Sequence, residues 1–248
     1  MTADRLVDPH PSAAAKHPRV LALACAAGMA LAGSACSSSG SSGGAASGGE
    51  RLSYDRVAST AKQLTGTSAC PFGLDPTAAL KAAGAERTVT PAASGGHPAA
   101  QGTVDQGRPA EAWPSGQPTP SGVPSNPAVP PNASVVCNFT ASEAPVEIDL
   151  VATSEGGVAV NLALPQIAYL GNLRAAEVMA FSKDKPGIGQ TRVTPGRGTV
   201  AVARVAVAGK GDLALVVSQG WPVTKADPAL AGESLRKVAE ALAAQLRP

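Results

Sequence analysis

The sequence predicts an α+β domain in which an antiparallel β-sheet of hairpins is packed by helices. Two observations lead to this class. Apolar residues recur at every second position in residues 146–152 and 158–164, as they do in strands, and a glycine-rich turn at residues 209–211 indicates a second hairpin. Helical spacing of apolar residues appears between these stretches and at the end of the chain. Hairpins joined by short turns favour an antiparallel sheet over a parallel one.

An export signal is predicted at the N-terminus, in residues 1–35. Its apolar core, residues 20–32, has the length of a signal core and is shorter than the roughly 20 residues that span a bilayer. A buried core helix is the competing interpretation, but the Ser/Gly run after Cys36 offers no element to pack against. Three basic residues precede the core: Arg5, Lys16 and Arg19. We therefore expect this protein to cross a membrane.

Cys36 is the predicted lipid-attachment site. The small residues before it resemble the end of the lipobox of bacterial lipoproteins, in which the cysteine becomes the acylated N-terminus. The segment departs from that pattern because Gly33 stands where an apolar residue is usual. Cleavage after Ala35 by an ordinary signal peptidase, which would release a secreted protein, therefore stays open. Cys25 is a rival lipid site, but the apolar run before it is too short for a signal core.

The other two of the four cysteines, Cys70 and Cys137, are predicted to form a disulfide, because an even pair in an exported protein favours a bridge. Two separate buried thiols, or half of a metal site, are the alternatives. A metal would need more ligands, and the one histidine after the signal, His97, lies in a Pro/Gly-rich stretch. We expect no cofactor and no metal.

Composition argues against nucleic acid as a partner. The net charge is only +2 and no basic cluster is present, so the chain lacks the electrostatic footprint of a nucleic-acid-binding protein. Aromatic residues make up 3% of the chain, which leaves no row of rings on which bases could stack.

The chain after the signal is expected to hold a tether and one folded domain. Residues 36–50 are rich in Ser and Gly, which predicts a disordered tether. The domain spans residues 51–248. Two short helices are expected between residues 51 and 87, and the second begins at the cap residue Asp75, followed by Pro76 in the first turn.

Residues 88–132 differ in composition from the rest of the domain. Ten prolines and six glycines fall between residues 91 and 131, with almost no β-branched or aromatic residues. Such a segment cannot bury enough apolar surface to offset the entropy lost on ordering. We therefore expect a disordered Pro/Gly-rich insertion within the loop that the predicted disulfide closes. A proline-rich ligand for an aromatic groove is the alternative.

Two hairpins are predicted from residue 133 onward. In the first, residues 146–152 pair with residues 158–164 across a turn at residues 154–157. In the second, residues 199–208 pair with residues 212–219. The polar residues that alternate with the apolar ones in residues 146–152 are expected to form a face open to water.

Two further helices are predicted from periodicity and capping signals. The first runs from Pro165 to about Phe181. The last begins with Asp227 as N-cap and Pro228 in its first turn. Its apolar stripe consists of Leu235, Val238, Leu242 and Leu246. Opposite charges four residues apart support its outer face, in Glu233 with Lys237 and in Arg236 with Glu240.

The sequence offers few groups that could serve nucleophilic catalysis. Without a histidine in the folded zone, a serine–lysine pair is the remaining route to nucleophilic catalysis. Ser59 with Lys62, and Ser234 with Lys237, have the S-x-x-K spacing, but the motifs that accompany it in known enzymes are absent. Solvated surface residues are the simpler interpretation.

Carboxylates and glycine-rich turns are the remaining candidates. Glu147 and Asp149 are two residues apart on one predicted strand and so point the same way, which could suit a general acid and base. Their alternation with apolar residues explains them equally well as the outer face of the sheet. The glycine-rich pieces at residues 186–189 and 209–211 lack phosphate-loop spacing and are interpreted as turns.

The order of these features resembles that of a family of small actinobacterial envelope lipoproteins. The resemblance lies in an early cysteine before a short helix (residues 70–75), a second cysteine before an aromatic (Cys137 and Phe139), a Gly-x-Gly turn (residues 187–189), a late hairpin and a closing helix. Members of that family are described largely as domains of unknown function, and related folds serve as extracytoplasmic sensor domains. The chain departs by having Phe139 where tryptophan is frequent and by the insertion at residues 88–132. The resemblance implies a disulfide-closed α+β domain outside the membrane and no catalytic residue.

Taken with the export signal, these observations favour a non-catalytic protein, lipid-anchored on the extracytoplasmic face of the cell membrane, that binds a small ligand or an envelope protein. Membrane contact is expected through the lipid anchor. A serine–lysine hydrolase and a structural or accessory subunit of an envelope complex are the alternatives.

Overall fold

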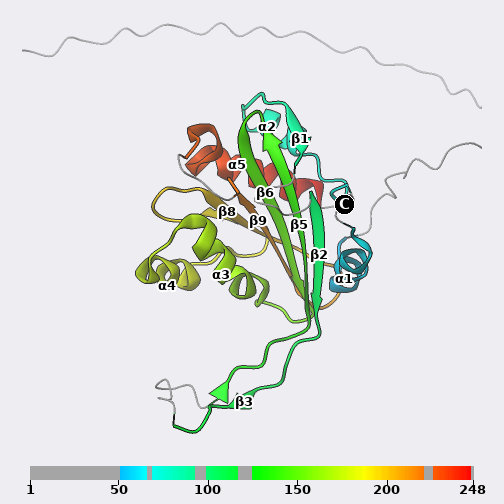
Figure 1. The fold of residues 1–248 in the computed structure, drawn as a ribbon, viewed down its shortest axis with the longest axis vertical. Coiled ribbons are helices and arrows are strands. Elements are labelled where there is room, and N and C mark those ends of the chain that lie inside the picture. The colour runs from blue at the N-terminus through cyan, green and yellow to red at the C-terminus, as the bar shows by residue number, and fades with distance from the viewer. Residues whose placement is uncertain (1–50, 66–68, 93–98, 117–124, 221–225, 247–248) are drawn as a thin grey trace, which may run out of the picture. The chain divides into compact units, whose positions relative to one another are not determined.

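The computed structural model of this chain describes residues 51–65, 69–92, 99–116, 125–220 and 226–246 (Figure 1). The predicted export signal, Cys36 and the tether lie outside the described residues. The predicted α+β class is confirmed: helices pack on an antiparallel sheet whose strands are joined in part by hairpins.

The central sheet has the strand order β1-β5-β6-β9-β8-β7, and β2 also pairs with β5. Every pairing of these strands is antiparallel. Their bounds are β1 (Val89–Pro91), β2 (Ala100–Asp105), β5 (Asn132–Ala141), β6 (Ala144–Thr153), β7 (Thr191–Val193), β8 (Val200–Val205) and β9 (Asp212–Ser218). The second predicted hairpin is confirmed as β8–β9. The first strand of the other predicted hairpin is confirmed as β6, but it pairs with β5 and β9.

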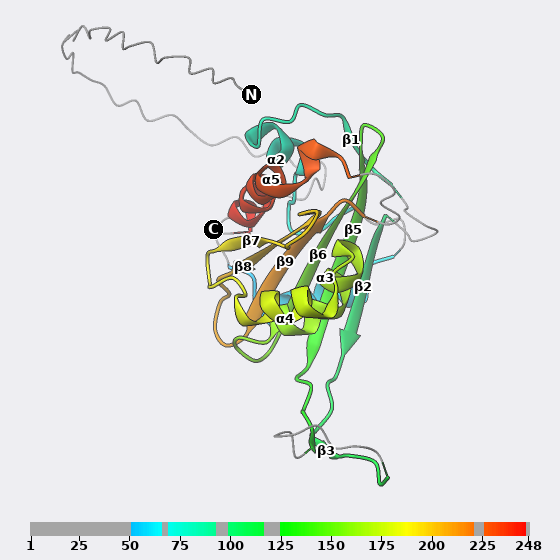
Figure 2. The same cartoon turned by 90° about the vertical axis from the view of Figure 1, so that its left-hand side faces the viewer.

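Helices cover both faces of this sheet (Figures 1 and 2). One face packs against α1 (Tyr54–Gln63), α2 (Pro76–Ala82) and α5 (Gly232–Gln245), and the other against α3 (Ala159–Gly171). The helix α4 (Ala175–Lys183) follows α3 and buries Phe181 in the same cluster. The sheet therefore separates two hydrophobic cores.

The larger core lies under α5 and confirms the predicted stripe of the last helix. All four stripe residues are buried there: Leu235, Val238, Leu242 and Leu246. The predicted start of the helix is wrong. Asp227 does accept a hydrogen bond from the Ala229 amide at 2.9 Å, but it caps only a short 3₁₀ turn, Pro228–Leu230. The extended backbone of Ala231 ends that turn, so α5 begins afresh at Gly232.

The prediction of a strand at residues 158–164 is wrong, because these residues form the first half of α3. Apolar residues alternate there, but the residues between them include Ala159 and Ala163, which also suit a helical face. Burial follows helical spacing, and the buried residues are Ala159, Val160, Ala163, Ile167, Leu170 and Gly171. Pro165 stands inside this helix rather than at its start. The helix ends at Asn172 in the left-handed conformation, so the single predicted helix is two.

The prediction of disorder for residues 88–132 is wrong where strands form. β2 pairs with β5 over its whole length, from Ala100 opposite Cys137 to Asp105 opposite Asn132. Beyond β2, β3 (Glu111–Ala112) pairs with β4 (Ser125–Asn126) in a small separate ladder (Figures 1 and 2). Composition indicates how little apolar surface a segment can bury by itself. It does not reveal that β5 pairs with β2 and so orders part of this segment.

Gly102 on β2 is required by the close approach of α1. A Cβ atom at this position would lie 2.2 Å from the carbonyl oxygen of Ala61 and 2.5 Å from its Cα. Because both are backbone atoms of a helix, the contact can be relieved only by moving α1 off the sheet. The variant Gly102→Ala is therefore expected to lose about 2 kcal/mol in the free energy of unfolding, measured by urea denaturation.

Gly156 provides the matched control for this substitution. Its nearest neighbour would be the Gly211 carbonyl oxygen at 3.8 Å, an ordinary contact distance. Gly156→Ala should leave the free energy of unfolding nearly unchanged. Equal losses in both variants would show that the close approach of α1 to β2 does not limit the size of residue 102.

Candidate functional site

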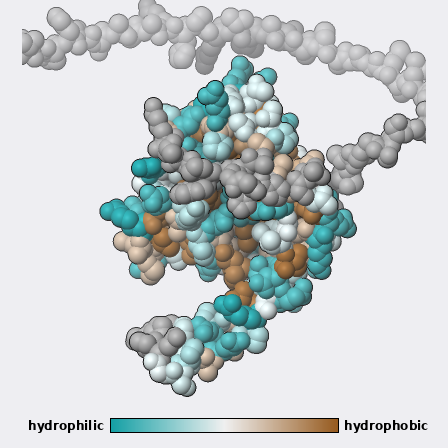
Figure 3. Space-filling view, in the orientation of Figure 1, coloured by the Kyte–Doolittle hydropathy of each residue, from teal (hydrophilic) through white to brown (hydrophobic). Residues whose placement is uncertain are grey.

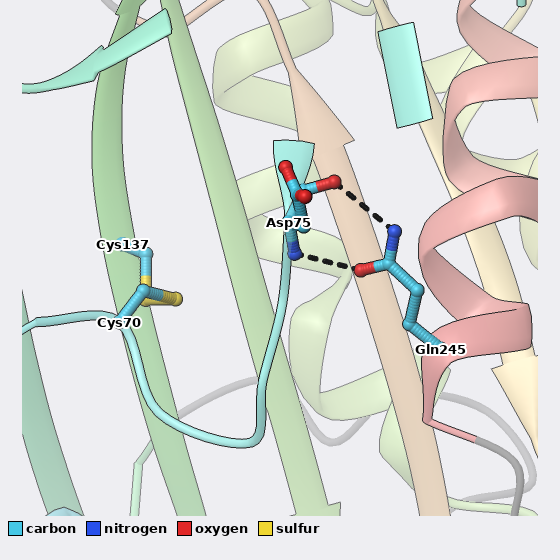
Figure 4. Close-up of a disulfide and its surroundings, with 4 residues drawn as sticks. All are labelled: Cys70, Asp75, Cys137 and Gln245. Carbon is cyan, nitrogen blue, oxygen red and sulfur yellow. Dashed lines mark hydrogen bonds between the residues drawn. A yellow bond between two sulfur atoms is a disulfide. The ribbon is translucent and has the colours of Figure 1, made fainter. Parts of the chain in front are cut away.

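The predicted disulfide is confirmed, because Cys70 and Cys137 are bonded with 5.6 Å between their Cα atoms (Figure 4). Cys137 lies on β5 and is buried, while Cys70 precedes α2. The same segment is tied to α5. The Asp75 amide donates to Gln245 Oε1 at 2.7 Å, and Gln245 Nε2 donates to the Asp75 carbonyl at 3.0 Å (Figure 4). The bridge and this hydrogen-bonded pair thus fix the start of α2 against both the sheet and the last helix.

Two carboxylates lie between α3 and the sheet. The prediction that Glu147 and Asp149 stand on an open, wet face of β6 is wrong, since α3 packs on that face. Asp149 is only 4% exposed. Glu147 is half-buried and accepts a hydrogen bond from Gln166 Nε2 of α3 at 2.7 Å. Alternation along β6 predicts correctly that Glu147 and Asp149 share one face of the strand. That face is not open to water, because α3, later in the chain, covers it.

The surroundings of Asp149 are largely apolar. Its register partners are Val136 on β5 and Val216 on β9, and Val151 is the next residue on the same face of β6. Its Oδ1 atom is buried without a hydrogen-bond partner among the described residues. Burial, and secondarily the charge of Glu147, raises the pKa of Asp149 to about 7.

A carboxyl with such a pKa can take up or release a proton near neutral pH. The neighbouring Glu147 carboxylate and the Gln166 amide supply further polar atoms at the same place. Among the described residues, no group of three or more His, Cys, Asp or Glu side chains is arranged to hold a metal ion. We name Glu147, Asp149 and Gln166 the acidic site.

A second buried carboxylate, Asp212, caps α3 at its N-terminus. Its Oδ2 accepts from the Ala159 amide at 3.0 Å, and its Oδ1 accepts from Arg204 Nε at 2.6 Å. The sequence predicts neither this role nor that of Gln166. The sequence shows Asp212 only as an acidic residue directly after the turn at residues 209–211. Its partner, the Ala159 amide, lies 53 residues earlier in the chain, so no local pattern connects the two.

The serine–lysine pairs lie on helix surfaces. Ser59 and Lys62 are exposed on α1, and the Ser59 hydroxyl donates to the Arg56 carbonyl at 3.0 Å. On α5, Ser234 is half-buried and Lys237 is exposed. Neither arrangement offers the buried amine that would serve as a base for a serine nucleophile.

An open groove of about 700 Å³ lies between β7 and α5. Its charged side chains are already paired: Arg236 binds Glu233 and Glu240 on α5, and Arg192 binds Asp184 after α4. Because these charges satisfy one another, the groove presents no uncompensated charge for a ligand. The acidic site is therefore the stronger candidate.

Comparison with protein-family models, with curated proteins and with solved structures finds no match. The resemblance to actinobacterial envelope lipoproteins thus stays a prediction from the order of sequence features. Within the part of the chain that the structure describes, no helix has the length and apolar character needed to cross a membrane.

Proposed function

We propose that this protein is exported and lipid-anchored in the cell envelope, and that its domain at residues 51–248 binds a small ligand or another envelope component without catalysing a reaction. The disulfide between Cys70 and Cys137 carries the proposal. Disulfides persist in oxidising compartments outside the cytoplasm, which agrees with the export signal and the lipobox-like segment before Cys36.

A binding role is favoured over catalysis by the position of the candidate groups. Both serine–lysine pairs lie on helix surfaces, so the alternative of a serine–lysine hydrolase has no supporting geometry. The acidic site offers proton exchange and hydrogen bonding, and it contains no nucleophile activated by a base. An accessory subunit that recognises a protein partner differs from this proposal only in the size of what is bound.

Replacing Cys36 tests the anchor. In cells fed a palmitate analogue that can be labelled, the unaltered chain should incorporate the label and remain with the membrane fraction. Cys36→Ser should lose the label entirely, because no thiol remains at the predicted attachment site. Gel fluorescence of the immunoprecipitated protein measures the incorporation.

Cys25→Ser is the matched control and should retain full labelling, since it removes the rival thiol and leaves Cys36 in place. Labelling that survives in Cys36→Ser would overturn the anchor assignment, and so would labelling lost only in Cys25→Ser. Release of the unaltered chain into the medium without label would indicate cleavage after Ala35.

A further inference from the structure

The acidic site joins α3 to the sheet through groups whose charge depends on pH. We propose that Asp149 acts as a proton-operated latch: its protonated carboxyl lets α3 lie closed on the sheet, and loss of the proton favours lifting of α3 from β6. This rests on the proposed function only in that export exposes the domain to the pH outside the cytoplasm. The chemistry of the latch itself is a property of the folded domain.

The closed arrangement disfavours an ionised Asp149. A buried carboxylate needs hydrogen-bond donors or a cation, and Oδ1 has no partner among the described residues. Directly opposite it on the two neighbouring strands are Val136 and Val216, and Glu147 and Val151 flank it on the same face of β6. A neutral carboxyl fits this setting better than a charged one.

The charged groups around Asp149 add to this preference. On its own strand, the carboxylate of Glu147 repels it. The facing positions of β5 are Ser134, Val136 and Asn138, and those of β9 are Ala214, Val216 and Ser218. On α3, Tyr169 has the one titratable side chain. Towards the other end of this face, Asp212 is held by Arg204, so that cation is already paired.

The hydrogen bonds that join α3 to the sheet differ along its length. At its N-terminus, the Ala159 amide is held by Asp212, an ion-paired and buried carboxylate. Further along the helix, Gln166 reaches the sheet through Glu147, next to Asp149. Ionisation of Asp149 therefore acts on the middle of α3 and beyond, while the capped N-terminus can serve as the hinge.

Opening would also move a hydrophobic surface. Tyr169 on α3 and Met179 on α4 are two of the three large hydrophobic side chains that are exposed within the described residues. Figure 3 shows the apolar surface over α4 at the left of the view. Because α4 follows α3 after only a short connection, a shift of α3 changes how this surface is presented to a ligand or partner.

The sign of the pH dependence follows from the two states. In the open state, water surrounds the carboxyl and its pKa returns toward its ordinary value of 3.8, whereas in the closed state the pKa is about 7. Between these values the closed state holds the proton more tightly, so each rise of one pH unit should increase the opening equilibrium up to about tenfold. Above the closed-state pKa both states are ionised, and the increase should level off.

Amide hydrogen exchange tests the latch on residues 37–248, which contain the whole compact unit Ala45–Pro248. Protection factors, corrected for intrinsic exchange, are measured for α3 and α5 between pH 5 and pH 8. We expect the protection of α3 to fall roughly 50-fold between pH 5 and pH 7, and then to fall by a further factor of only about two as it levels off. The amides of α5, on the opposite face of the sheet, become exposed only by wider unfolding, so they should stay better protected than those of α3 at every pH.

Two substitutions isolate the responsible group. Asp149→Asn keeps the shape and removes the charge, so α3 should keep its protection across the range. Glu147→Gln keeps an acceptor for Gln166 and removes the repulsion, which lowers the closed-state pKa of Asp149. In that variant the fall should end at a lower pH and be smaller in total.

The latch is overturned if α3 in Asp149→Asn loses protection with pH as the unaltered chain does, or if α3 and α5 have the same protection factors at each pH, because both would then exchange through one common unfolding. Should Asp149→Asn fail to fold, the comparison of α3 with α5 in the unaltered chain decides between the same two outcomes. Neither outcome depends on Cys36, so failure of the latch leaves the labelling result untouched, and the reverse also holds.

Discussion

Loss of the disulfide between Cys70 and Cys137 should lower the free energy of unfolding by about 4 kcal/mol. The bridge joins residues 67 apart in sequence, and the loop that it closes contains α2, the strands β1 to β4 and part of β5. In the unfolded chain, this closure removes conformational freedom that the reduced chain retains. Because the loop is long and contains many prolines and glycines, the bridge is expected to be a major contribution to stability.

Urea denaturation of residues 37–248, with and without a reducing agent, measures this difference. The double variant Cys70→Ser/Cys137→Ser should unfold at the lower urea concentration of the reduced chain, and the reductant should not change it further. Since residues 37–248 contain no other cysteine, the reductant has no second target. A double variant as stable as the oxidised chain would show that the bridge contributes nothing.

Replacing Asp212 by alanine is expected to cost about 4 kcal/mol, the second large effect. The side chain of Asp212 is 2% exposed and that of its partner Arg204 is 17% exposed, so the pair is shielded from water. The substitution leaves Arg204 without its anion and the Ala159 amide without its acceptor. Both the ion pair and the N-terminal cap of α3 are lost together.

Two further variants separate these contributions. Arg204→Met removes the cation but keeps the cap. In the double variant Asp212→Leu/Arg204→Met no buried charge is left unpaired, so the loss should be smaller than the sum of the losses in Asp212→Leu and in Arg204→Met. Asp184→Ala, which breaks the exposed pair of Asp184 with Arg192, should leave stability nearly unchanged. A similar small effect for Asp212→Ala would contradict the structural role assigned to Asp212.

Several elements could be predicted from the sequence because their signals are local. The cap Asp75 and Pro76 mark the start of α2, and Asp75 does accept from the Ala78 amide. The stripe from Leu235 to Leu246 and the turn at residues 209–211 identify α5 and the hairpin β8–β9. Each signal depends on residues within a few positions of one another, so hydrogen bonding and side-chain spacing suffice.

Two of the wrong predictions concern what packs against an element. Residues 158–164 satisfy both the strand and the helix period, and the helix forms with its apolar face on the sheet and its N-terminus capped by Asp212. Residues 100–105 have an unfavourable composition, yet β5 offers them a complete ladder of hydrogen bonds. In both cases the deciding partner lies dozens of residues away.

By itself the sequence determined the class of fold, the pair of cysteines in the bridge and the expectation of export, because these follow from composition, spacing and local periodicity. Only the tertiary structure decided that Asp149 is buried. Alternation along a strand shows which residues share a face, but burial depends on what covers that face. Here the cover is α3, and its arrival converts an ordinary surface carboxylate into a group that holds its proton near neutral pH.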